Sequence, residues 1–366
     1  MKKYDIAGYI WPSYTGDEPR ARIFWEEGIG EWQTVKNQTP KACGYFWDRK
    51  PLWGYLNEAD PAVMSMHINT ALSHGVNVFI YDWYWYDGMP FLENCLNDGF
   101  LKAPNSNKMQ FYIMWANHDV NCLWDIRNSD KVDTTIWKGA VSRQEFEIIG
   151  KRWIEKYFSK ENYYKIDGKP VVSIYDMSNF VSGLGGVEET KNAVNWLREE
   201  AKKAGFSGVH FQFIRWCSNA HNITGVDGTR TEISAECYEE MGFDSLTHYQ
   251  FVHFADIDRD YEEILADVEK EWKAIDKEHK IPYYPHISVG WDNNPRFKKF
   301  RPGVVKNNTP EKFEKALKMA KDYADKKGVS LVTINSWNEW TETSYLLPDN
   351  VNGYGYLEAI KKVFTE

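Results

Sequence analysis

The sequence lacks several features that would assign it to common classes of protein. Its five cysteines are odd in number and scattered, and no CxxC or Cys/His spacing occurs, so neither a disulfide framework nor a zinc site is indicated. No apolar run approaches the roughly 20 residues that span a bilayer. P-loop and HExxH motifs are also missing, and Gly183-Leu184-Gly185-Gly186 lacks the third glycine of a dinucleotide fingerprint. These absences predict a protein without a metal, a cofactor or a membrane-spanning segment.

An excess of positive charge is missing as well. The chain has 44 Lys and Arg against 53 Asp and Glu, a net charge of −9, and this argues against a nucleic-acid or anionic-membrane partner, which needs a basic face. The N-terminus has no apolar signal region, because Asp5 and Pro12 interrupt it. As written, the sequence predicts a cytoplasmic protein; a trimmed signal peptide would instead place it in the periplasm or at the cell surface.

Aromatic residues, by contrast, are abundant. The 17 Trp, 22 Tyr and 19 Phe make up 16% of the chain. Core packing uses many such rings, but a carbohydrate cleft also needs them, since the C–H faces of sugars pack on indole and phenol rings. Composition leaves both interpretations open, so the position of the rings in the fold has to decide between them.

Eight short β-rich runs alternate with amphipathic segments along the chain. The runs are apolar and bounded by Gly, Pro, Asn or Asp, as expected of strands that are buried on both faces. The predicted strands are 4–11, 77–85, 109–116, 169–176, 208–215, 245–251, 283–291 and 330–338.

Helix signals fill most of the gaps between these strands. Asp60-Pro61 and Thr309-Pro310 each combine an N-cap residue with a proline at the first helical position, and Ser142 begins a capping box. Residues 187–204 and 260–278 show apolar side chains at helical spacing. The sequence therefore predicts an α/β fold.

The alternation fits one closed (β/α)8 barrel, with residues 1–366 as a single catalytic domain. An open doubly wound sheet is the alternative that this pattern also allows. Two long irregular segments, 12–57 and 117–140, are expected to lie over the C-terminal mouth of the barrel, where such loops shape the active site.

Polar and aromatic residues gather directly after the predicted strands. That rim is open to solvent, so packing alone explains its tryptophans poorly, and we predict a sugar-binding wall. Trp83, Trp115 and Trp291 are expected to line one cleft. The full set of predicted substrate-binding residues is Trp11, Tyr14, Asp82, Trp83, Tyr84, Trp115, Asn117, His118, Arg215, Trp216, Tyr249, Trp291, Asn338 and Trp340.

The run Asn338-Glu339-Trp340-Thr341-Glu342 follows the eighth predicted strand. Glycoside cleavage needs one carboxyl to protonate the leaving oxygen and a second one at the anomeric side or a neighbouring hydroxyl. Glutamates three apart diverge on a straight strand, so the chain must turn just after Glu339. We predict Glu339 and Glu342 as the catalytic pair; two solvated glutamates in a loop are the alternative.

A second acidic motif, Asp256-Ile257-Asp258, has the DxD form that holds a metal and a diphosphate in many nucleotide-sugar transferases. It precedes a helix rich in acidic residues, where an acidic N-terminal cap is the simpler explanation. His286 lies within the seventh predicted strand and is assigned to the core, whereas His118 is placed to contact substrate.

These motifs together carry a family resemblance. The chain resembles the WbsX-type proteins of bacterial polysaccharide clusters, which are similar to glycoside hydrolase family 99, the endo-α-mannosidase and endo-α-mannanase family. The resemblance extends over nearly the whole chain, and the distinctive islands are 8–10, 30–32, 79–84, 115–117 and 337–342. The last island corresponds to the family's N-E-W-x-E segment.

The resemblance implies a (β/α)8 barrel, retention of configuration and no metal. It also implies that Glu339 deprotonates the 2-hydroxyl of the sugar, which attacks C1 to give a 1,2-anhydro sugar, while Glu342 protonates the leaving group and then activates water. The chain departs from its relatives at Thr341, where the hydrolases usually have His, and at His118-Asp119, where WbsX proteins often have Glu-Asn. Both differences concern substrate identity.

Three functions remain open at this point. The leading hypothesis is a retaining glycoside hydrolase that acts on α-mannoside-type or related bonds of an oligosaccharide or polysaccharide. The second is a glycosyltransferase of surface polysaccharide biosynthesis, although the chain lacks a nucleotide-binding fingerprint. The third is a catalytically silent sugar-binding barrel, against which the presence of both glutamates argues.

Overall fold

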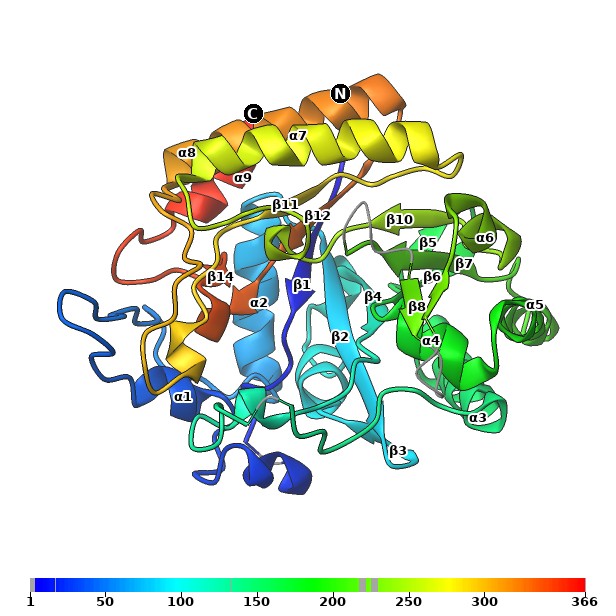
Figure 1. Cartoon of the computed structure of the whole chain (residues 1–366), viewed down its shortest axis with the longest axis horizontal. Coiled ribbons are helices and arrows are strands. Elements are labelled where there is room, and N and C mark those ends of the chain that lie inside the picture. Colours follow the sequence, from blue (N-terminus) through cyan, green and yellow to red (C-terminus); the bar gives the residue numbers. More distant parts are fainter. Residues whose placement is uncertain (1–3, 17, 132, 217–221, 225–229, 366) are drawn as a thin grey trace.

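The computed structural model describes residues 4–16, 18–131, 133–216, 222–224 and 230–365. The eight predicted strands are all present and parallel, and they form a nearly closed barrel (Figure 1). They are β1 (Asp5–Ile10), β2 (Val78–Tyr86), β4 (Gln110–Trp115), β6 (Lys169–Ile174), β7 (His210–Ile214), β10 (Ser245–Thr247), β11 (His286–Ser288) and β12 (Leu331–Asn335).

The sheet order is β10-β7-β6-β4-β2-β1-β12-β11, so the first strand pairs with the last one. Between β10 and β11 the ring is joined by a parallel bridge from Leu246 to Tyr283. Leu246 N donates to Pro282 O at 3.1 Å, and Tyr284 N donates to Leu246 O at 2.9 Å. The predicted barrel is therefore confirmed, and the open sheet is wrong.

Helices surround the barrel, and Figure 1 shows α7 and α8 side by side along one edge of it. The predicted caps are present: Ser142 Oγ accepts from Glu145 N, and the Asp60 side chain accepts from Ala62 N. The helices are α1 (Trp32–Lys36), α2 (Pro61–Ser73), α3 (Arg143–Trp153), α4 (Met177–Leu184), α5 (Val187–Lys203), α6 (Ala235–Glu240), α7 (Tyr261–Glu278), α8 (Pro310–Lys327) and α9 (Gly355–Phe364).

Several short strands lie outside the ring. They are β3 (Met89–Phe91) and β5 (Lys165–Ile166), which pair antiparallel with β2 and β6, and two separate antiparallel pairs, β8 (Asn222–Thr224) with β9 (Arg230–Glu232) and β13 (Asn338–Glu339) with β14 (Ser344–Tyr345). No helix in the described residues is long and apolar enough to cross a membrane.

Candidate active site

A cleft of about 280 Å³ lies at the carboxyl ends of the barrel strands. It contains both predicted catalytic glutamates, together with six of the predicted substrate-binding residues. The lining residues are Trp11, Asp82, Tyr84, Met114, Ala116, His118, Asp119, Leu123, Trp124, Tyr175, Trp216, Tyr249, Arg296, Glu339 and Glu342. The prediction that Trp11 and Glu339 lie at the same end of the barrel is confirmed.

The two glutamates converge because the chain turns directly after Glu339. Glu339 ends the short strand β13, and residues Trp340–Glu342 form a single 3-10 turn. Side chains three residues apart eclipse each other in a 3-10 turn, whereas they point to opposite faces of a strand. The turn thus directs Glu339 and Glu342 into one cleft, as the sequence predicted.

Arg296 lies between the two glutamates. It comes from the loop between β11 and α8, and its side chain is almost completely buried. Nη1 donates to Glu342 Oε1 at 2.5 Å, and Nη2 donates to Glu339 Oε2 at 3.4 Å. A single guanidinium therefore contacts both candidate catalytic carboxyls.

Glu31 holds the other side of this guanidinium. Its Oε1 accepts from Arg296 Nε at 2.9 Å, and its Oε2 accepts from Trp11 Nε1 at 2.5 Å. Gly30 precedes it with φ near +58°, and a Cβ at this position would meet the carbonyl oxygen of Ser13 at 1.6 Å. Only glycine fits there. Gly30 therefore allows the backbone conformation that places Glu31 against Arg296.

A tyrosine joins the cluster to a third carboxyl of the cleft. The Tyr249 hydroxyl lies 2.8 Å from Asp82 Oδ2 and 3.0 Å from Glu339 Oε1. Tyr249 follows β10, Asp82 lies on β2, and Glu339 follows β12. Three separate parts of the barrel thus meet at one hydroxyl group.

Burial controls the ionisation of these acids. Burial, with the nearby Glu342 carboxylate, raises the pKa of Glu339 well above its usual range, although Arg296 opposes the shift. Burial also raises the pKa of Glu342 against the same guanidinium, and it raises the pKa of Asp82 well above its usual range. These shifts are in the direction that a general acid requires.

Aromatic rings form the walls of the cleft. Trp216 is 39% exposed and stacks on His253, with ring centroids 4.3 Å apart and planes 3° apart. Its Nε1 donates to the carbonyl oxygen of Tyr175, which also lines the cleft. Such an exposed, rigid indole face is suited to the C–H face of a sugar ring.

Trp83 and Trp115 do not line the cleft, contrary to expectation. Strand side chains alternate between faces, and the register pairs Asp82 with Met114 and Trp83 with Trp115. Asp82 and Met114 face the cleft, so both tryptophans face outward, where they pack on Trp153 of α3. They belong to the layer between strands and helices.

Trp291 lies in a separate hollow of about 190 Å³, together with Tyr45, Phe46 and Arg49. This hollow lies beside the cleft, since Asp292 N donates to the carbonyl oxygen of Glu342 at 2.7 Å. The expectation that Trp83, Trp115 and Trp291 share one cleft is therefore wrong.

Two polar residues of the predicted set also lie outside the cleft lining. Arg215 is buried against α7, where Nε donates to Glu271 and Nη2 donates to Glu278. The Asn117 side chain bonds to both backbone groups of Asp176, at 2.8 Å each. Each of these side chains thus joins a strand end to a neighbouring element.

Tyr14, Asn338 and Trp340 form a layer behind the cleft. Asn338 Oδ1 accepts from Trp11 N, and its Nδ2 donates to Trp11 O and to Glu58 Oε2. The Tyr14 hydroxyl accepts from Trp340 N at 3.2 Å. These contacts hold Trp11 and the 3-10 turn together, so the three residues support the cleft without lining it.

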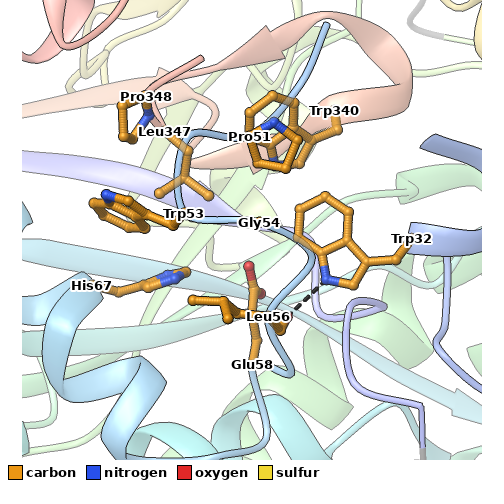
Figure 2. A pocket seen from close by; sticks show the side chains of 10 residues that line it. All are labelled: Trp32, Pro51, Trp53, Gly54, Leu56, Glu58, His67, Trp340, Leu347 and Pro348. Carbon is orange, nitrogen blue, oxygen red and sulfur yellow. Dashed lines mark hydrogen bonds between the residues drawn. The ribbon is translucent and has the colours of Figure 1, made fainter. Parts of the chain in front are cut away.

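Figure 2 shows a small pocket on the far side of this layer, lined by Trp32, Trp53, Glu58, His67 and Trp340 among others. Its free volume of about 10 Å³ is the space of about one water molecule. Burial raises the pKa of Glu58 to about 8 and lowers the pKa of His67 to about 3. The pocket is too small for a sugar.

Several residues of the cleft had no role predicted from the sequence. Glu31 lies in an island of family resemblance, but nothing in the sequence links it to Arg296, which is 265 residues away. Arg296 follows the seventh predicted strand. This position in a strand-to-helix loop, where barrel active-site residues lie, could have identified it as a candidate. Trp124 and Tyr175 were missed as well.

The DxD motif lies away from the cleft lining. Asp258 forms an ion pair with Lys306 at 2.9 Å, and the N-cap of α7 is Asp260, whose side chain accepts from Glu262 N. The acidic cap is therefore two residues later than the motif. Among the described residues, no group of three or more His, Cys, Asp or Glu side chains is arranged to hold a metal ion.

Solved structures share this fold at low sequence identity. A glycoside hydrolase-like protein superimposes with a TM-score of 0.60 at 15% identity, covering 100% of this chain and 94% of the other. The GH99 endo-α-mannosidase from Bacteroides thetaiotaomicron superimposes with a TM-score of 0.58 at 15% identity, covering 98% of this chain and 95% of its own. These similarities establish the fold.

Sequence comparison adds a relative and a family. The protein named "Uncharacterized protein WxcX" from Xanthomonas campestris pv. campestris, in each of two strains, is 22% identical over 352 residues. The match covers 95% of this chain and 48% of the relative, so the chain spans about half the length of the curated relatives that it matches. The family described as "Glycosyltransferase WbsX" matches residues 11–360, and the chain belongs to this family.

Proposed function

We propose that this protein is a retaining glycoside hydrolase that cleaves α-mannoside-type or related α-glycosidic bonds of an oligosaccharide or polysaccharide. The observation that carries the proposal is the convergence of Glu339 and Glu342 on one guanidinium inside an aromatic-walled cleft. Two carboxyls of raised pKa in a site with an exposed indole face are the groups that glycoside cleavage requires.

In the proposed mechanism Glu339 takes the proton of the 2-hydroxyl, and the resulting oxygen attacks C1 to form a 1,2-anhydro sugar. Glu342 gives its proton to the leaving oxygen in the same step. Glu342 then takes a proton from water, which opens the epoxide at C1, and Glu339 returns its proton to O2. Two inversions at C1 give net retention, and both glutamates finish in their starting states.

Arg296 sets a condition on these roles. It is closer to Glu342 than to Glu339, and a guanidinium favours the ionised form of its nearest carboxyl. Glu342 can serve as the acid only after bound substrate weakens this contact. Glu31 can retain the guanidinium meanwhile, because it already accepts from Nε.

A glycosyltransferase is the second candidate, and the description of the family model favours it. A transferase that uses a nucleotide sugar needs a site for the diphosphate. Among the described residues the DxD motif is engaged with Lys306 outside the cleft lining, and no metal cluster is arranged. Nucleotide-sugar turnover by the purified protein, with no cleavage of any glycan, would favour the transferase.

The proposal is tested by polysaccharide digestion, with the first-formed anomer identified by NMR. Glu342→Gln should lower kcat/KM by about 10²- to 10⁴-fold for natural linkages but less for activated aryl glycosides. Glu339→Gln should lower kcat/KM for natural linkages and for activated aryl glycosides alike. The parent protein should not cleave a substrate that lacks the 2-hydroxyl. Glu58→Gln, a loss of a buried carboxyl outside the cleft lining, is the control. Brisk cleavage of the 2-deoxy sugar, or a covalent adduct on Glu339 in mass spectrometry, would contradict the mechanism.

A further inference from the structure

The contact between Tyr249 and two carboxyls restricts where protons can lie in the cleft. A phenol hydroxyl has one proton, so it can donate to Asp82 or to Glu339, but not to both. Both contacts, at 2.8 and 3.0 Å, are hydrogen bonds only if one of the two acids is protonated and donates to the phenol oxygen. The geometry therefore favours a proton on one of these acids.

The surroundings of Asp82 favour this acid as the place for that proton. Its Oδ1 is buried and has no hydrogen-bond partner within the described residues, and none of their cationic side chains forms an ion pair with it. Glu339, by contrast, contacts Arg296. A buried carboxylate without a cation is costly, so the acid without one retains the proton.

Other groups around Asp82 add no positive charge. The ionisable groups that interact with it electrostatically are phenols and carboxyls from several parts of the barrel. They are Tyr9 on β1, Tyr84 on β2, Tyr175 after β6, Tyr249 after β10, and Glu339 and Glu342 after β12. Each would be further disfavoured as an anion beside an ionised Asp82.

We propose that Asp82 is a positioning residue that remains protonated at pH 7, and that its proton makes the Tyr249 hydroxyl donate to Glu339. The hydrogen bonds then run in one direction, from Asp82 to Tyr249 to Glu339. This arrangement keeps Glu339 ionised with its base function available, while the Asp82 proton stays in place throughout the reaction. The effect on the reaction rests on the proposed function, but the protonation of Asp82 does not.

The direct test is infrared spectroscopy at pH 7 on protein labelled with ¹³C in the aspartate side-chain carboxyls. A protonated carboxyl absorbs at a C=O frequency well separated from that of a carboxylate. We expect one carboxylic-acid band that shifts with the label and disappears in Asp82→Asn. Glu58→Gln is the matched control, since it should remove only a label-insensitive band. An acid spectrum without any label-sensitive band would place the proton on Glu339 and overturn the proposal.

A kinetic test follows if glycosidase activity is found. The side-chain amide introduced by Asp82→Asn can still donate to Tyr249 but cannot ionise, so kcat/KM for an activated aryl glycoside should stay within about tenfold of the parent, and the loss of activity at alkaline pH should move upward. Asp82→Leu cannot donate and should lose more than about 100-fold. Equal losses of kcat/KM in both variants, with an unchanged pH profile, would show that Asp82 contributes only to packing and would contradict the proposal. If no glycoside is cleaved, the proposed function fails while the infrared result stands.

Discussion

Asn338 and Glu339 are neighbours in β13, yet their side chains enter two different buried environments. Glu339 faces the cleft, where Arg296 and the Tyr249 hydroxyl contact it. Asn338 donates to Glu58 in the small pocket behind, and the Cys95 thiol also donates to that acid, at 3.8 Å. Burial raises the pKa of both carboxyls. Burial alone therefore favours a protonated acid, as at Glu58. An acid that exchanges protons with a substrate also needs a nearby cation and an open cleft, as at Glu339.

Arg296→Met should have the largest effect on stability, because it removes the cation from the cleft around Glu339. Glu31, Glu339 and Glu342 would then be buried without it, and we expect the free energy of unfolding to fall by about 3–5 kcal/mol at pH 8. Without the cation the folded-state pKa values of Glu339 and Glu342 rise further, so the loss grows as pH increases above about 4.5 and should be smaller at pH 5. Urea unfolding at the two pH values measures it.

Arg215→Met is the control for this substitution. Arg215 is equally buried and pairs with Glu271 and Glu278 away from the cleft lining. The Arg215→Met variant should lose a similar amount of unfolding free energy, but the folded variant should still bind glycan. Full stability of Arg296→Met at pH 8 would contradict the role of Arg296 as the cation that compensates the buried carboxyls.

Glu58→Gln tests the environment behind the cleft. The folded-state pKa of Glu58, about 8, lies above its unfolded value of about 4.5, so the parent binds this proton more tightly when folded and loses stability as pH rises from 4.5 to 8. Glutamine mimics the neutral acid and removes that loss. We expect the variant to match the parent near pH 5 and to be more stable at pH 8 by a few kcal/mol, at roughly 1.4 kcal/mol per pKa unit.

Glu93→Gln provides a control of opposite sign. Burial opposes ionisation of Glu93, but Arg152 and Tyr157 outweigh it and lower the pKa to about 2. Its contribution to stability is present above the unfolded pKa and is lost as pH falls toward 2. The variant should therefore be less stable than the parent at pH 8. Equal pH dependence of Glu58→Gln and the parent would contradict the assignment of Glu58.

Trp216→Leu should have the smallest effect on stability and a clear effect on binding. The ring is 39% exposed, so we expect a loss of about 1 kcal/mol or less in the free energy of unfolding. Loss of a sugar platform should weaken glycan affinity about tenfold, as measured by calorimetry. Trp83→Leu is the matched control on the outer face of β2, and it should cost several kcal/mol of stability with unchanged affinity. Unchanged affinity in Trp216→Leu would remove this ring from the binding wall.

Much of the fold could be predicted from the sequence, because strand and helix periods and caps are local. Ser142, Asp60 and Thr309 begin the helices that their spacing predicted. The turn at Glu339 followed from the requirement that two carboxyls share one cleft. The barrel then placed the strand ends together, so the cleft contains eight of the predicted site residues.

The faces of the strands were harder to assign. The second half of β2 offers both Asp82 with Tyr84 and Trp83 with Trp85, and the prediction drew on both sets. Asp82 could have decided between the two sets, since a carboxyl is poorly tolerated between strands and helices and should face the cleft. Neighbouring strand residues point to opposite faces, so Trp83 must then face outward. Arg296 could not be paired with Glu31 from sequence, because that contact depends on how two long loops fold over the barrel mouth.

The pairing of β1 with β12 has a consequence for the order in which the protein can be built during translation. Asp5 lies opposite Leu331, and the Asn338 side chain accepts from the backbone N–H of Trp11 and donates to its carbonyl oxygen. The edge of β1 that pairs with β12 therefore stays unpaired until more than 300 further residues have been synthesised. A nascent chain can assemble most of the ring in order, but it gains both glutamates of the cleft only after the last of the eight ring strands has been made.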